Sequence, residues 1–176
     1  MTHRQAVSAF IGLGSNQGSA EENLARALEL LGAITGCTLG AVSPVYHTEP
    51  QGLKDQPWFC NQVARLDCEP WWRDAPECLM EELLAIESRM GRTSAVRQAT
   101  PRFGPRIIDL DLLFMDGVEI HTPAVTLPHP RMRERAFVLV PLHDIAPDLT
   151  IGDGETVAQA LARLTHVRDG QVIRQD

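Results

Sequence analysis

The feature that most constrains this chain is residues 107–114, an apolar run interrupted only by Asp109 and Asp111. The run, Ile-Ile-Asp-Leu-Asp-Leu-Leu-Phe, is typical of a β-strand. Because side chains alternate between the two faces of a strand, the two carboxylates point the same way, with Cα atoms about 6.5–7 Å apart, and Leu110 points to a core. Neighbouring carboxylates repel each other and lose hydration, so a cation, an arginine or water must offset the cost.

Two interpretations of the aspartate pair follow. Hard divalent cations bound by both carboxylates would suit phosphate chemistry. Alternatively, the pair lies on the hydrated face of an antiparallel sheet and is neutralised by arginines. The pattern is short, so the neighbouring segments must decide between the two.

An arginine-rich segment precedes the pair. Of the 16 basic residues only Lys54 is a lysine, and the formal net charge of the chain is −7. Residues 88–108 contain no acidic residue, and they contain five arginines: Arg89, Arg92, Arg97, Arg102 and Arg106. This local excess indicates a small polyanionic ligand, because the guanidinium group suits bidentate phosphate recognition. A basic loop that only keeps the surface hydrated is the alternative.

Length and composition indicate an ordinary globular protein, which we expect to be one domain over residues 1–176. No apolar run is long enough to cross a bilayer, and the first residues do not resemble a signal peptide, so a cytoplasmic location is expected. The acidic net charge argues against nucleic-acid or membrane partners. The four cysteines are irregularly spaced, which favours free thiols over a zinc site or disulfides.

Hydrophobic patterns predict strands over residues 7–13, 39–46, 59–66 and 107–115, with a loop at 47–58. Helices are predicted to begin at a Ser19–Glu22 capping box, at Asp74 as N-cap, and at a Thr156–Gln159 capping box. The apolar stripe of the second helix lies next to Glu87, whose carboxylate needs an ion pair with Arg89 or a later arginine.

The remaining segments are less regular. Asp116-Gly117 predicts a hairpin to a returning strand at 118–122. Residues 93–105 are predicted to be a mobile loop, residues 138–145 an irregular segment or a short helix, and residues 166–176 an edge strand or a frayed tail. Two βαβ-like halves with hairpins predict an α+β fold, ferredoxin-like in the simplest case, with helices packed on a mixed or antiparallel sheet.

The run from Arg102 to Leu113 resembles the signature of the 6-hydroxymethyl-7,8-dihydropterin pyrophosphokinase family. Four further segments resemble family motifs in the same order, so the resemblance covers about residues 5–150. These segments are residues 11–16, 43–50, 55–61, and 127–130 with 135–137.

The resemblance implies transfer of pyrophosphate from ATP to the pterin hydroxymethyl group in folate biosynthesis, with release of AMP. It implies two Mg²⁺ ions held by Asp109 and Asp111, and it adds Arg92 and Arg97 to these two aspartates as catalytic residues. The implied pterin-binding residues are Thr48, Gln51, Phe59, Asn61 and Phe137. The implied ATP-binding residues are Glu87, Arg92, Arg102, Arg106, Ile107, His129 and Arg135.

Two departures from the family pattern matter. The arginine loop is longer than in shorter members, so either Arg97 or Arg102 closes over the phosphates. Phe103 replaces a frequent tryptophan, which keeps apolar cover but loses an indole donor.

Two other functions compete with this one: another D-x-D metal-dependent transferase that uses a nucleotide, and a non-catalytic ferredoxin-like binding module. The expected partners are the small molecules ATP and dihydropterin. We expect a monomer, with a weak homodimer as the alternative.

Overall fold

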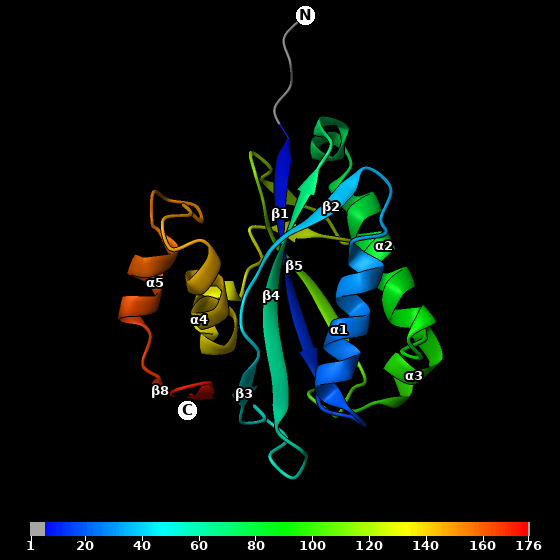
Figure 1. Ribbon diagram of the computed structural model, residues 1–176, viewed down its shortest axis with the longest axis vertical. Coiled ribbons are helices and arrows are strands. Elements are labelled where there is room, and N and C mark those ends of the chain that lie inside the picture. Colours follow the sequence, from blue (N-terminus) through cyan, green and yellow to red (C-terminus); the bar gives the residue numbers. More distant parts are fainter. Residues whose placement is uncertain (1–5, 176) are drawn as a thin grey trace, which may run out of the picture.

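A mostly antiparallel sheet runs through the molecule and carries helices on both of its faces (Figure 1). The computed structural model describes residues 6–175. The strands of the main sheet are β1 (Val7–Ser15), β2 (Cys37–Val42), β3 (Tyr46–Thr48), β4 (Phe59–Cys68), β5 (Asp109–Met115), β8 (Val167–Asp169) and β9 (Val172–Arg174). The helices are α1 (Ala20–Leu31), α2 (Pro76–Arg89), α3 (Ser94–Ala99), α4 (Ala136–Ile145) and α5 (Val157–Arg163). Two short 3₁₀ helices, Pro70–Asp74 and Met132–Glu134, and a small sheet of β6 (Ile120–His121) and β7 (Thr126–Leu127) complete the described elements.

The topology confirms the predicted ferredoxin-like α+β fold. The strand order is β5-β1-β4-β3-β9-β8, and β2 also pairs with β4. Two split βαβ units form this core, β1-α1-β2 and β4-α2-β5. In the first unit β4 lies between β1 and β2 and runs antiparallel to both. The β3–β9 pairing is parallel and extends this sheet with the C-terminal residues.

Each face of the sheet packs a separate part of the core. Ile11 lies on the face covered by α1 and α2, where it joins Leu24 and Leu83. Its neighbour Phe10 points to the opposite face, where Leu139 of α4 packs. Because both faces of β1 are covered, its sequence reads as a nearly continuous apolar run rather than an alternating one.

The predicted strand at 39–46 is two strands in the structure. β2 ends at Val42 and β3 begins at Tyr46, with Pro44 in the break. Proline has no backbone N–H to donate to a ladder, so the chain leaves the sheet at this position and re-enters it further along β4.

The predicted return strand at 118–122 is wrong. The turn after β5 forms, since the Val118 N–H donates to the Met115 carbonyl at 3.0 Å. The next residues then pair with Thr126–Leu127 instead of β5. Part of the free edge of β5 is occupied from elsewhere, because the Leu113 carbonyl accepts a hydrogen bond from the His129 N–H at 2.8 Å.

The predicted mobile loop at 93–105 contains a helix, α3. Thr93 caps it, and its Oγ1 accepts a hydrogen bond from the Val96 N–H at 3.3 Å. The predicted start of α1 is confirmed, because Ser19 occupies its N-cap, whereas the predicted Asp74 cap of α2 is wrong. Ser19 precedes α1 but makes no capping hydrogen bond, and α2 begins one residue late for an Asp74 cap, because Ala75 occupies that position.

Other predictions are confirmed. Residues 138–145 belong to a short helix, α4, and the tail forms edge strands, although Asp176 lies outside the described residues. Three cysteines are buried and Cys78 is exposed, and all four thiols are free. Across residues 6–175, none of the helices combines the length and apolar character that crossing a membrane requires.

The Thr156–Gln159 capping box forms as predicted. Thr156 Oγ1 accepts from the Gln159 N–H at 3.2 Å, and Gln159 Oε1 accepts from the Thr156 N–H at 2.9 Å. We expect Thr156→Ala to lower the unfolding free energy by about 1 kcal/mol, measured by urea denaturation. The matched variant Ser19→Ala should leave it nearly unchanged, because Ser19 makes no capping hydrogen bond. Equal losses in the two variants would contradict this account of both helix ends.

Candidate functional site

A cleft opens where β1 ends and where β4 and β5 begin. It brings together residues that the sequence assigned separately to metal, nucleotide and pterin binding. The predicted residues that line it are Thr48, Gln51, Phe59, Asn61, Arg106, Asp109, Asp111, His129, Arg135 and Phe137. The other predicted site residues do not line the cleft: Glu87, Arg92, Arg97, Arg102 and Ile107.

Glycines of β1 line a small pocket that adjoins the cleft and shares Asn61, Asp109 and Asp111 with it. Gly14 pairs with Asn61 of β4 on one side and with Asp109 of β5 on the other. A Cβ atom on Gly14 would lie 2.9 Å from Asn61 Oδ1. The missing side chain therefore lets an amide from one strand and a carboxylate from another share the same cleft.

Asp109 and Asp111 point to the same face of β5, as predicted. Their side chains are 22% and 35% exposed, while Leu110 between them is buried. Asp109 forms ion pairs with Arg92 and, at 3.2 Å, with Arg106 Nε. Asp111 has a looser contact, with its Oδ2 3.6 Å from Arg135 Nη1.

These different partners give the two aspartates different pKa values. Burial opposes ionisation of Asp109, but Arg106 and Arg92 outweigh it and hold the pKa of that carboxyl below its ordinary value. Burial and the neighbouring Asp109 raise the pKa of Asp111 to about 6, against the weaker effect of Arg135. The site is therefore short of positive charge at Asp111.

The buried carboxylate of Glu87 contacts both β5 and the arginine-rich segment. Glu87 of α2 is 1% exposed, and its Oε1 accepts from the Leu110 N–H at 2.7 Å. Arg92 Nη1 lies 3.1 Å from the same oxygen, and Arg97 pairs with the other one. Burial raises the pKa of Glu87, and Arg92 and the amide oppose that rise. The expected ion pair thus forms with later arginines and not with Arg89.

Two phenylalanine rings and an amide lie beside the arginines of the cleft. The Arg106 guanidinium lies 5.0 Å from the centre of the Phe59 ring, and Arg135 lies 5.6 Å from that of Phe137. Asn61 is buried, and its Nδ2 donates to Thr48 Oγ1 at 2.6 Å.

Sequence reasoning gave no site role to Glu49 or Asn16, and it gave Phe103 only as apolar cover. Glu49 and Phe103 also line the cleft. Asn16 lies behind it, where Oδ1 accepts from the Arg106 N–H at 2.8 Å and Nδ2 donates to the Pro57 carbonyl at 3.0 Å. The available signal was the position of Asn16 in the matched 11–16 segment, since a polar residue there follows a buried strand.

The raised pKa of Asp111 predicts a stability cost that depends on pH. The folded state binds this proton more tightly than the unfolded chain, whose pKa is near 3.8, so the cost is absent below about pH 4 and complete above about pH 6. We expect Asp111→Asn to raise Tm by about 2–4 °C at pH 7.5, after discounting for solvent screening and the lost Arg135 contact. At pH 4 the gain should vanish.

The control is Asp148→Asn, which removes the same charge from an exposed position. The difference in Tm between this variant and the wild type should not rise between pH 4 and pH 7.5. A destabilised Asp111→Asn protein at pH 7.5 would show that the carboxylate is a net stabilising partner of Arg135 rather than a strained one.

Comparisons with known proteins agree with this geometry. Residues 10–147 match the model of the 7,8-dihydro-6-hydroxymethylpterin-pyrophosphokinase (HPPK) family. A 2-amino-4-hydroxy-6-hydroxymethyldihydropteridine pyrophosphokinase from Methylorubrum extorquens is 47% identical over 89% of this chain and 92% of its own length. The enzyme of the same name from Pseudomonas aeruginosa is 40% identical over 87% of this chain and 89% of its own.

Solved structures show the same fold at low sequence identity. The structure of Plasmodium falciparum wild-type HPPK-DHPS with pteroate has a TM-score of 0.67 and 15% identity over 90% of this chain. The match spans 44% of that longer protein, so this chain corresponds to less than half of it. On the family match and the two bacterial relatives, this chain belongs to the 7,8-dihydro-6-hydroxymethylpterin-pyrophosphokinase family.

Proposed function

We propose that this chain transfers the pyrophosphoryl group of ATP to the hydroxymethyl group of 6-hydroxymethyl-7,8-dihydropterin, with release of AMP, in folate biosynthesis. The observation that carries the proposal is one cleft in which a same-face aspartate pair lies between arginines and an aromatic pocket. We further propose that residues 1–176 act as one domain, as a cytoplasmic monomer.

Asp109 and Asp111 are suited to holding two Mg²⁺ ions. Carboxylate oxygens are the hard ligands that Mg²⁺ prefers, and burial and the neighbouring Asp109 raise the pKa of Asp111 although arginines lie nearby. When bound, the ions would neutralise the phosphate oxygens and polarise the attacked phosphorus. A non-catalytic binding module would have no need to keep two carboxylates side by side at this cost.

His129 and the arginines form the nucleotide side of the proposed site. Burial and the nearby Arg135 and Arg131 lower the pKa of His129 to about 4, so the imidazole is neutral at physiological pH. Its Nδ1 accepts from the Arg131 N–H at 3.2 Å, which leaves the proton on Nε2. His129 can therefore donate a hydrogen bond to ATP, while Arg106 and Arg135 supply positive charge.

The aromatic and amide residues of the cleft suit a flat heterocycle. Phe59 and Phe137 offer apolar ring surfaces, and the buried Asn61 offers an edge for hydrogen bonding. Because Asn61 Nδ2 already donates to Thr48, its Oδ1 is available to accept from an amino group of the pterin. The backbone at Thr48 and Gln51 would complete this pocket. Positioning the hydroxymethyl group against the β-phosphate then accounts for most of the catalysis.

Incubation with ATP, Mg²⁺ and 6-hydroxymethyl-7,8-dihydropterin should produce AMP, measured by chromatography. Asp109→Ala and Asp111→Ala should each lower turnover by at least about 10²–10³-fold, because each removes charge compensation at the transferring group. Their circular dichroism spectra should match that of the wild type, and Asp148→Asn should retain full turnover. Substantial activity in both aspartate variants would show that the pair is not the metal site.

The two arginines that compete for the phosphates have different contacts. Arg97 is paired with Glu87, whereas Arg102 lies over the Phe103 ring at 4.9 Å, with no acidic partner within the described part of the chain. We expect Arg102→Ala to lower kcat about 10- to 100-fold with Tm unchanged, because a charge-assisted phosphate contact is lost. Arg97→Ala should lower Tm by roughly 2–4 °C, because Glu87 loses a partner. The reverse pattern would assign the phosphate contact to Arg97.

A further inference from the structure

The C-terminal strand β9 lies beside the proposed pterin pocket, outside the segment that matches the family model. It pairs in parallel with β3, with Val172 opposite His47 and Ile173 opposite Thr48. Ile173 is 1% exposed and packs in a small core cluster with Tyr46 and α4. The family match ends at residue 147, so this strand lies outside the matched segment.

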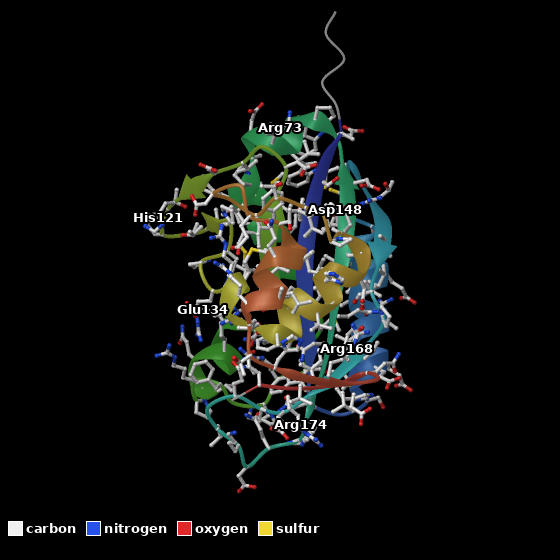
Figure 2. The ribbon with its side chains drawn as sticks, turned by 90° about the vertical axis from the view of Figure 1, so that its left-hand side faces the viewer. Arg73, His121, Glu134, Asp148, Arg168 and Arg174 are labelled. Atoms are coloured by element: carbon white, nitrogen blue, oxygen red, sulfur yellow. The ribbon has the colours of Figure 1, made fainter. Side chains whose placement is uncertain are left out.

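The preceding strand anchors β9 firmly. Arg168 Nη2 donates to the Tyr46 hydroxyl at 2.6 Å, and its guanidinium lies 5.0 Å from the centre of that ring. Arg168 Nη1 also lies 3.6 Å from Asp144 of α4. Figure 2 shows Arg168 and Arg174 on the C-terminal hairpin, which lies across the lower part of the molecule. The hairpin is therefore fixed to the core before it reaches the pocket.

Arg174 contacts both ends of the loop at residues 49–58. Its Nε lies 3.1 Å from Glu49 Oε1, at the start of this loop. Its guanidinium lies 5.6 Å from the centre of the Trp58 ring, at the end of the loop. The Arg174 side chain thus connects the two ends of the loop.

Gln175 connects the same loop to the start of α4. Its Oε1 accepts hydrogen bonds from the Ala136 N–H at 2.7 Å and from Gln51 Nε2 at 3.4 Å. Its Nε2 donates to the Glu134 carbonyl at 2.7 Å. Gln51 and Phe137, which follows Ala136, both line the cleft. A single amide therefore bridges two segments of the proposed pterin pocket.

We propose that the C-terminal strand supports the pterin site from outside the cleft and that Gln175 is a positioning residue for dihydropterin. The inference rests on the proposed assignment of the pterin pocket. Gln175 sets the spacing between the 49–58 loop and Phe137 before the substrate arrives. Without this bridge, binding must order the loop itself, and the entropic cost weakens the affinity for the pterin.

The test compares Gln175→Ala with Gln171→Ala, which truncates a glutamine of the same hairpin whose contact to the core uses its backbone carbonyl. Binding of 6-hydroxymethyl-7,8-dihydropterin and of a non-hydrolysable ATP analogue with Mg²⁺ is measured by calorimetry. For Gln175→Ala we expect a pterin Kd and KM about five- to tenfold higher, with kcat and the nucleotide Kd unchanged. Gln171→Ala should behave like the wild type.

The conservative variant Gln175→Glu keeps an acceptor oxygen for Ala136 and Gln51 but loses the donor to Glu134, so it should recover part of the pterin affinity. An unchanged pterin Kd in Gln175→Ala would overturn the proposal. Equal weakening of pterin and nucleotide binding would also overturn it, because that result indicates a general loss of structure.

A parallel Asn61→Ala variant separates this proposal from the pocket assignment. If Asn61→Ala weakens pterin binding and Gln175→Ala does not, only the role of Gln175 fails. If neither variant changes the pterin Kd, the assignment of the pocket fails as well.

Discussion

The repulsion between Asp109 and Asp111 is the constraint on which the rest of the site depends. Two adjacent carboxylates at the start of β5 would be driven apart or protonated if their surroundings were only apolar. Arginines neutralise the charge of Asp109 closely, whereas Asp111 has only the looser contact with Arg135. Arg92 contacts Asp109, the Ile108 carbonyl and the buried Glu87, so the beginning of the strand is fixed from behind. The charge deficit left at Asp111 is a local cost in stability that a bound cation would relieve.

The ferredoxin-like sheet turns this local pair into a site for two substrates. Because β1 lies between β4 and β5, Gly14 separates Asn61 from Asp109 by only the width of one strand. The fold therefore places the buried Asn61 amide next to the carboxylates of the aspartate pair. A larger residue than glycine at this position would collide with the Asn61 amide.

Local patterns predicted the features that depend on local spacing. The period of two in residues 107–114 gave the shared face of the aspartates, and apolar runs located the central strands correctly. The failures required knowledge of distant segments. The hairpin after Gly117 was wrong partly because His129 occupies an edge carbonyl of β5. The contacts of Gln175 could not be predicted, because they exist only once β9 has paired in parallel with β3.

The 49–58 loop connects these distant contributions. Gln56 Nε2 donates to the Phe103 carbonyl at 2.7 Å, and Asn16 bonds both to this loop and to the Arg106 backbone. Gln175 holds the loop from the other side. A change in the loop on pterin binding must therefore act on the arginine segment as well, because the two share hydrogen bonds. The loop is thus a physical link between the two halves of the cleft, and its contacts come from both ends of the chain.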